Sequence, residues 1–453
     1  MIKEDLSYLK WVLIHVAIGV AVQFVPFISK IYGIGMYLFW ILYIIKKQNK
    51  HNEVLIAAAY IVGSEVFLRM THGNPLYEIT KYGVMVFLFL GMYYSGLSKG
   101  AVPYWVFLIL LVPSVVISTF VLDFETNVRK AIMFNISGPL CLGFASLYTF
   151  RRKISLEQMN TILLALGMPV ISCMTYIFIH APSTKEIITG TSSSSAASGG
   201  FGPNQVATIL GLGMFIFFSR IVLCSKSTLQ VVINAILALL IGYRGLVTFS
   251  RGGMITGVLM LGLLVVFLYR KSNFNGRIKL NYIVVLISFV LFAGWSYTAL
   301  QTSGLINKRY ANQDINGKEK ASKFTGREDI ANAEIDLFFK NPVFGVGVGK
   351  GYELRKAESG DDVLSHDEIT RMLAEHGSLG ILGLMILFFT PLFLYIENKF
   401  NMFLLCFVVF WFLTINHAAM RTAAPSFVYA LSLLNVQLGA PVVKKKEGSR
   451  YDL

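Results

Sequence analysis

Charged residues are scarce in this chain. Asp, Glu, Lys and Arg together make up 14% of its 453 residues, whereas hydrophobic residues make up 55%. Soluble globular domains carry roughly 25% charged residues, so the composition excludes an ordinary soluble protein. It indicates a polytopic membrane protein.

Cysteine is rare and forms no pattern. The four cysteines are Cys141, Cys173, Cys224 and Cys406, and each lies within or at the end of an apolar stretch. None belongs to a CxxC pair, so neither a disulfide framework nor a zinc site is indicated. We expect all four to be packing residues.

Three further patterns are missing. Alternating apolar and polar residues, as in the strands of a membrane barrel, do not occur. The first apolar stretch lacks a small-x-small cleavage site and another follows at once, so we expect a membrane helix and not a cleaved signal. The two halves show no internal repeat, which argues modestly against an inverted-repeat transporter.

What the sequence does contain is a series of apolar stretches, long enough to cross a hydrocarbon core of about 30 Å as helices. We therefore predict an all-α integral membrane protein with about fourteen spans, or twelve if the weakest are not counted. The predicted spans are residues 11–29, 31–45, 54–70, 82–98, 104–122, 131–150, 161–179, 205–224, 229–249, 254–268, 282–300, 381–396, 403–414 and 423–438.

Basic residues predict the orientation of these spans. They cluster after the even-numbered spans, at positions 46–47, 151–153, 220–226, 270–279 and 444–446. By the positive-inside rule both termini are then cytoplasmic. The net charge of +15 is explained by this bias and not by nucleic-acid binding.

The prediction divides the chain into four parts. Residues 1–302 carry the first eleven membrane helices. Residues 303–375 form a long external loop with an amphipathic helix, residues 376–438 carry the last three membrane helices, and residues 439–453 are a short basic cytoplasmic tail. The polar loop is where we expect the chemistry.

Arg251 lies where one apolar span ends and the next begins, with two glycines directly after it. A guanidinium at the external membrane boundary, next to closely approachable backbone, suits a phosphate or diphosphate. The alternative is an interfacial arginine that reaches lipid headgroups. Arg244, deeper in the same span, must also find a partner because an unpaired charge in a bilayer is costly.

Thr325 and Glu328 have the spacing of a capping box and predict a helix that extends to about Lys340. Arg327 falls in its first turn, where a cation opposes the helix dipole. Together with the free amides it would form an anion site. A solvated surface arginine is the alternative.

His366 precedes the twelfth predicted span and is flanked by Asp367 and Glu368. An imidazole beside carboxylates suits a general base, although a lone histidine can also be structural. His376 is its main rival. The glycines at 345, 347, 349 and 351 match neither nucleotide-binding pattern and favour a backbone turn.

The order and spacing of these motifs closely resemble the O-antigen ligase and O-antigen polymerase family. The motifs are Ser250-Arg251-Gly252, Gly326-Arg327, Asn341-Pro342 with Gly345 and Gly347, His366, and Glu375-His376-Gly377. A segment opening the eighth span, residues 202–207, is also similar to the family. The resemblance covers roughly residues 200–383.

The resemblance implies an integral membrane glycosyltransferase that uses undecaprenyl-diphosphate-linked glycans on the external face of the bacterial inner (plasma) membrane, with no cofactor and no essential metal. Carried over, Arg251 and Arg327 would bind the donor diphosphate, and His366 would activate the acceptor hydroxyl. Candidate substrate-binding residues are Arg244, Asn204, Asp367 and Glu328. Asp367 departs from the asparagine that the family usually has there, which bears on how His366 is oriented.

The expected function is an O-antigen, capsule or exopolysaccharide polymerase, which inverts the configuration of the transferred sugar without a metal. An O-antigen ligase acting on lipid A-core is the alternative within the family, although no segment specific for that acceptor can be recognised. A flippase for lipid-linked oligosaccharides is the alternative of another class, but transport does not require the long loop with its Arg and His residues. Expected partners are the lipid-linked donor, a glycan acceptor and membrane lipids, not nucleic acid.

Overall fold

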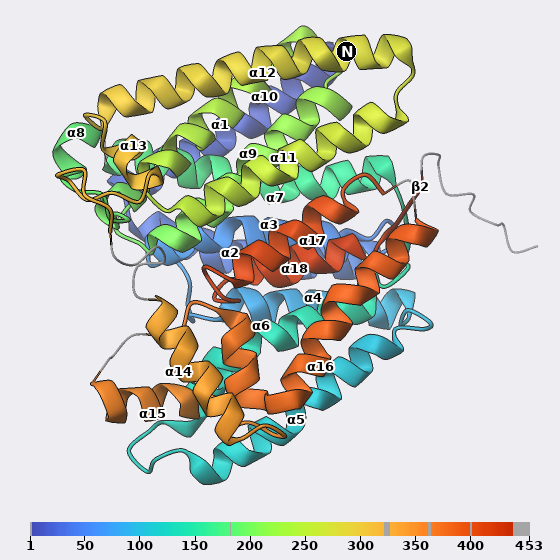
Figure 1. Ribbon diagram of the computed structural model, residues 1–453. Helices are drawn as coiled ribbons and strands as arrows, with labels where there is room; N and C mark the ends of the chain where they lie inside the picture. Colours follow the sequence, from blue (N-terminus) through green and yellow to red (C-terminus); the bar gives the residue numbers. More distant parts are fainter. Residues whose placement is uncertain (1, 182, 321–326, 361–363, 399–400, 438–453) are drawn as a thin grey trace, which may run out of the picture.

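The structure is a computed structural model that describes residues 2–181, 183–320, 327–360, 364–398 and 401–437. It is a bundle of long helices that run roughly side by side (Figure 1). The short elements that do not pack inside this bundle lie at its two ends (Figure 1).

Ten of the described helices are long and apolar enough to cross a membrane. They are α1 (Ile2–Phe24), α2 (Phe27–Lys47), α5 (Val102–Val121), α6 (Val128–Thr149), α7 (Leu156–His180), α9 (Pro203–Leu223), α10 (Thr228–Val247), α11 (Arg251–Lys271), α12 (Phe274–Gln301) and α16 (Glu368–Glu397). The prediction of an all-α, multi-pass membrane protein is confirmed.

The other four predicted spans coincide with shorter or more polar helices: α3 (Glu53–Met70), α4 (Ile79–Ser95), α17 (Leu404–Ile415) and α18 (Ala423–Ser432). Almost every residue of α3 and α18 is buried, and most of α17 is as well. A helix surrounded by protein does not have to match the hydrocarbon thickness. The predicted spans match α3, α4 and α17 closely in length, whereas α18 ends at Ser432 and not at residue 438.

The helices pack in an order that interleaves the two halves of the chain. α9 contacts α7, α10 and α11. Both α1 and α3 contact α7, whereas α18 contacts α6 and α17. α16 packs on α5, at the far side of the bundle from α12 (Figure 1). The last helices therefore lie between elements from the first half.

One end of the bundle carries the short elements α8 (Thr184–Ile187), η1 (Ala196–Ser198), α13 (Leu305–Tyr310), α14 (Arg327–Lys340) and α15 (Lys350–Ser359) (Figure 1). α14 ends at Lys340 as predicted, whereas residues 321–326, which include the predicted cap Thr325, lie outside the described residues. At the opposite end, β1 (Lys153–Ser155) pairs in parallel with β2 (Asn435–Gln437).

α16 begins thirteen residues earlier than the predicted span at residue 381. Its N-cap is Asp367, whose carboxylate accepts the backbone N–H of Ile369 at 2.8 Å. Gly377 interrupts the helix with φ 60°, and the glycine run fits into this break. There the N–H groups of Val346 and Gly347 donate to the carbonyls of Ala374 and Glu375. The run is thus the backbone turn that its sequence predicts.

Candidate functional site

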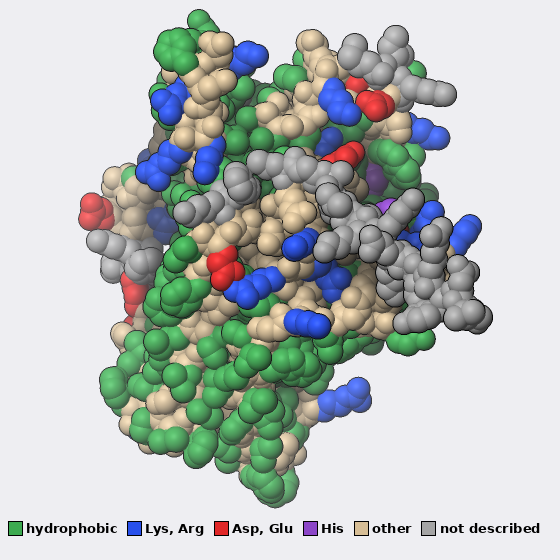
Figure 2. All heavy atoms as spheres, turned by 90° about the vertical axis from the view of Figure 1, so that its right-hand side faces the viewer, with side chains coloured by type: hydrophobic (Ala, Val, Ile, Leu, Met, Phe, Trp, Pro, Cys, Tyr) green, Lys and Arg blue, Asp and Glu red, His purple; other side chains and the backbone are tan. Residues whose placement is uncertain are grey.

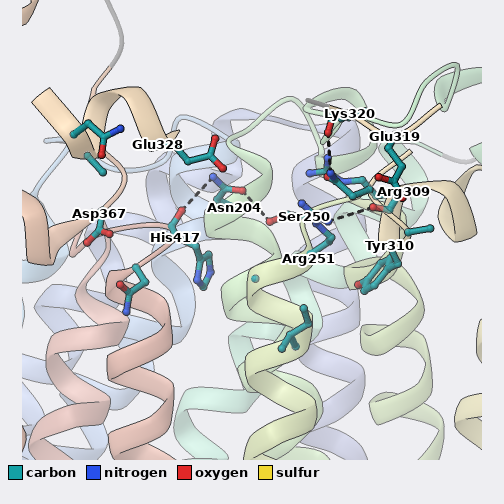
Figure 3. Close-up of a pocket in the computed structure, with 17 residues that line it drawn as sticks. Asn204, Ser250, Arg251, Arg309, Tyr310, Glu319, Lys320, Glu328, Asp367 and His417 are labelled. Atoms are coloured by element: carbon teal, nitrogen blue, oxygen red, sulfur yellow. Dashed lines mark hydrogen bonds between the residues drawn. The ribbon is translucent and has the colours of Figure 1, made fainter. Parts of the chain in front are cut away.

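A cavity of about 940 Å³ opens at the end of the bundle that carries α13 and α14. Its lining comes from six separate segments of the chain (Figure 3). The lining residues are Asn204, Ser250, Arg251, Gly252, Ile255, Arg309, Tyr310, Ala311, Asn312, Glu319, Lys320, Glu328, Ala331, Asn332, Asp367, Asn416 and His417.

The turn between α10 and α11 places Arg251 at the cavity. It consists of three residues only, and buried Phe249 has a left-handed backbone with φ 58°. Ser250 donates from Oγ to Asn204 Oδ1 at 2.8 Å, which ties the turn to the start of α9. Arg251 is the first residue of α11, so its side chain stands beside the free amides of a helix N-terminus. That combination attracts anions.

Two further cations lie near Arg251, and we call the three residues Arg251, Arg309 and Lys320 the cationic wall (Figure 3). Arg309 donates from Nε to the carbonyl of Phe249 at 2.8 Å, and Arg251 Nη1 lies 3.5 Å from the carbonyl of Arg309. Burial lowers the pKa of Lys320, and repulsion by Arg309 and Arg251 lowers it further. The cationic wall is therefore crowded with like charge that an anion would relieve.

A small hairpin brings Lys320 back to Arg309. Gln313 and Glu319 form an antiparallel bridge, and Gly317 turns the chain with φ 84°. The backbone N–H of Lys320 donates to the carbonyl of Asn312 at 3.0 Å. The sequence analysis missed this cation, although the Asn316-Gly317 pair is a recognised hairpin signal.

Glu328, Asp367 and His417 line the cavity across from the cationic wall, and we call them the opposite wall (Figure 3). His417 belongs to the turn between α17 and α18 and is only 9% exposed. Its Nδ1 lies 2.8 Å from the carbonyl of Leu413, and its Nε2 lies 3.2 Å from Thr208 Oγ1. The analysis of the sequence also missed His417, which could have been found as a histidine at the external end of a predicted span.

The segment with His366 is held by the same turn. The carbonyl of His366 accepts the N–H of Ala419 at 3.0 Å, and the carbonyl of Ser365 accepts Arg421 Nη2 at 2.9 Å. His366 itself is half-buried and is not among the lining residues, whereas its neighbour Asp367 is.

The other predicted residues divide between cavity and interior. Asn204 and Glu328 reach the cavity with Arg251 and Asp367. Arg327 begins α14 next to Glu328, but its side chain lies outside the described residues. His376, the rival base, is buried within α16 and does not line the cavity.

Arg244 is not brought to the cavity. It is 1% exposed, and its Nη2 donates to the carbonyls of Ile177 and Ala181 at 2.5 and 2.6 Å, with the guanidinium over the ring of Phe178. Ile177 lies in the last turn of α7, and Ala181 is the C-cap residue of that helix. Arg244 therefore joins α10 to the end of α7.

No group of three His, Cys, Asp or Glu side chains within the described residues is placed to hold a metal ion. The cavity offers a cluster of cations, with Glu319 beside them, that faces the carboxylates of Glu328 and Asp367 and the imidazole of His417. It can bind an anion on one side and hydroxyl groups on the other.

The fold and the cavity define a multi-pass membrane protein with a cationic site at one end of its helix bundle. Residues 235–385 match the family described as O-antigen ligase, which supports the resemblance to O-antigen ligases and polymerases. The match spans about a third of the chain, from α10 into α16, and includes Arg251, Arg309, Lys320, Glu328 and Asp367. No curated protein matches the sequence. The match supports a membrane enzyme of the glycosyltransferase type, with lipid-linked glycans as its class of substrate.

Proposed function

We propose that this protein is a polysaccharide polymerase that transfers a glycan from an undecaprenyl-diphosphate-linked donor to a sugar hydroxyl of an acceptor glycan. The observation that carries the proposal is the cavity with its cationic wall on one side and its opposite wall of carboxylates and histidine on the other. Such a division suits a reaction in which a diphosphate leaves while a hydroxyl attacks.

The cationic wall would bind the diphosphate of the donor. Arginine offers a planar fork of donors that matches phosphate oxygens, and the amides at the start of α11 add to the attraction. Negative charge grows on the diphosphate as its bond to the sugar breaks, so fixed cations stabilise the transition state more than the ground state. Arg327 joins this role through the family resemblance.

His366, the neighbour of Asp367 in the opposite wall, would take the proton of the acceptor hydroxyl, and Asp367 would help to place that hydroxyl. The hydroxyl oxygen forms a bond to the anomeric carbon, and the carbon–oxygen bond to the diphosphate breaks. The electron pair leaves with the diphosphate, and the proton leaves with His366. Attack from the face opposite the leaving group inverts the anomeric configuration, and no step needs a metal.

An apolar groove of about 340 Å³ between α16 and α17 supports entry of the donor from the membrane. Ile369 and Ile415 belong to its lining, and each lies within two residues of the cavity-lining Asp367 or Asn416. The rest of its lining is apolar too. A polyprenyl chain could lie there while its diphosphate reaches the cavity.

The basic side chains support an external location for the cavity. Lys and Arg residues are spread over the end of the bundle that carries β2, opposite the cavity (Figure 2). By the positive-inside rule that end faces the cytoplasm. Both termini would then be cytoplasmic, and the reaction would occur on the external face of the inner membrane.

The decisive experiment uses the purified full-length protein in lipid nanodiscs with a synthetic undecaprenyl-diphosphate oligosaccharide. A polymerase lengthens the lipid-linked glycan when no other acceptor is added. A ligase is active only when lipid A-core is supplied, and a flippase leaves the glycan unchanged but moves it across a vesicle membrane. The glycans on the surface of a strain that lacks the protein identify the natural product.

A further inference from the structure

Glu334, in the middle of α14, is a buried carboxylate that accepts hydrogen bonds from three sides. It is 1% exposed. Arg355 Nη1 of α15 lies 2.8 Å from Oε1, while Thr370 Oγ1 and Ser365 Oγ lie 2.6 and 3.2 Å from Oε2. A buried carboxylate with three donors is held in one position.

These hydrogen bonds connect two of the three parts of the chain that supply the opposite wall. Glu334 belongs to α14, whose first turn places Glu328 in the cavity. Ser365 and Thr370 stand on either side of His366 and Asp367. The carbonyl of Asp367 lies 3.1 Å from the same Ser365 Oγ, so the one hydroxyl proton is shared between this carbonyl and Glu334. The carboxylate of Glu334 therefore sets how far α14 lies from the segment with His366.

The interaction depends on the charge of Glu334. An ionised carboxylate only accepts hydrogen bonds, as its three donors require. Protonation would remove the ion pair with Arg355 and turn one oxygen into a donor that faces other donors. Burial raises the pKa of Glu334 to about 7; Thr370 and Arg355 lower it, and Glu375 raises it. The charged groups that face it from other elements are Arg355 of α15 and, from α16, Arg371 and Glu375.

We propose that Glu334 is a positioning residue of the transfer site, which as a carboxylate holds α14 and the His366–Asp367 segment at the spacing that transfer requires. This inference rests on the function proposed above. It adds that the site is assembled fully only when Glu334 is ionised, so that transfer slows as the pH falls through 7.

The test compares Glu334→Gln and Glu334→Asp with the wild type as full-length proteins in nanodiscs. The rate of transfer from the lipid-linked donor is measured over about 3 pH units around neutrality. Loss of one charge-assisted hydrogen-bond network should lower kcat of Glu334→Gln by about tenfold or more, with KM for the donor little changed. The ionisation near pH 7 should disappear from its rate profile. Glu334→Asp, which keeps the charge, should retain that ionisation and part of the rate.

Glu353→Gln is the matched control. Glu353 is a carboxylate of α15 that accepts Thr126 Oγ1 and Lys350 Nζ, away from the cavity. It should keep the wild-type rate and profile. The inference is overturned if Glu334→Gln has the wild-type kcat or keeps an ionisation near pH 7. If Glu334→Gln does not fold, the inference is overturned by a rate profile of Glu334→Asp that lacks this ionisation. A wild type that transfers nothing overturns the proposed function instead.

Discussion

The imidazole of His417 lies directly against Gly252, the residue after Arg251. A Cβ at position 252 would stand 2.5 Å from Cγ and 2.8 Å from Nδ1 of that ring. The glycine therefore leaves room for a side chain of the opposite wall at the start of α11. The glycine that follows Arg251 in the sequence motif thus has a packing role across the cavity.

Gly252→Ala should push His417 out of place. Overpacking of this kind costs about 1–3 kcal/mol of stability, and we expect turnover to fall with it. Gly262→Ala is the control, because it lies on the same helix with nothing within 4 Å of a new Cβ. It should be neutral or slightly stabilising. Thermal melting and turnover of both variants check this.

The double variant Gly252→Ala, His417→Ala separates strain from other effects. Removing the ring removes the clash, so its melting temperature should drop by less than the sum of the two single changes. Additive losses would show that the two residues do not press on each other.

Arg251→Lys should lose most transfer although the charge is kept, because an ammonium cannot replace the bidentate fork on a diphosphate. Arg327→Lys should behave alike if the family resemblance holds. Arg277→Lys, exposed at the opposite end of the bundle, serves as the control. Near-normal turnover of Arg251→Lys with lipid-linked donor would contradict the diphosphate role. Addition of a chelator should leave the wild type active.

Lys320 should make donor binding sensitive to alkaline pH. Because its pKa is lowered, it loses its charge at a lower pH than an ordinary lysine, and the attraction for diphosphate weakens as the pH rises through that value. We expect kcat/KM of the wild type to fall on the alkaline side. The Lys320→Arg variant should keep its kcat/KM to a higher pH. The exposed Lys318→Arg should follow the wild type. Identical alkaline limbs for all three would exclude Lys320 from the binding site.

The sequence predicted the residues whose role is local. Arg251 stands at the cavity because hydropathy places the ends of the two apolar helices that its three-residue turn joins. Asp367 was a candidate because it follows His366, and in the structure it caps a helix that begins earlier than predicted. The family resemblance added Asn204 and Glu328. The long apolar stretches also predicted each of the ten described helices that are long enough to cross a membrane.

The sequence did not predict the residues whose role depends on tertiary contacts. Arg309 reaches the site because it bonds the carbonyl of Phe249, and His417 because Gly252 leaves room for its ring. Arg244 failed as a cavity candidate because the end of α7 lies within its reach. No pattern along the chain encodes these contacts between distant segments.

Glu334→Gln should change how stability depends on pH, whatever the activity. The folded-state pKa of about 7 lies above the ordinary value of 4.5, so the stability from this group is fully present below pH 4.5 and is lost as the pH rises through 7. Glutamine does not titrate, so the variant does not lose this stability. Its free energy of unfolding relative to the wild type should therefore rise by up to about 3 kcal/mol between pH 5 and pH 8. Melting temperatures of both proteins at the two pH values test this. An equal gap at both would contradict the raised pKa.

His366→Ala should abolish transfer while donor binding is kept, because the imidazole serves the acceptor and the cationic wall serves the diphosphate. General acid–base catalysis is typically worth about 10²–10⁴-fold, so kcat should fall at least about a hundredfold with little change in donor affinity. The backbone of residue 366 still accepts the N–H of Ala419, so the loop should keep its place. His376→Ala is the rival variant, buried in α16. If His376→Ala is the inactive one after both proteins are shown to be folded, the base belongs to α16 and the family motif is misaligned here.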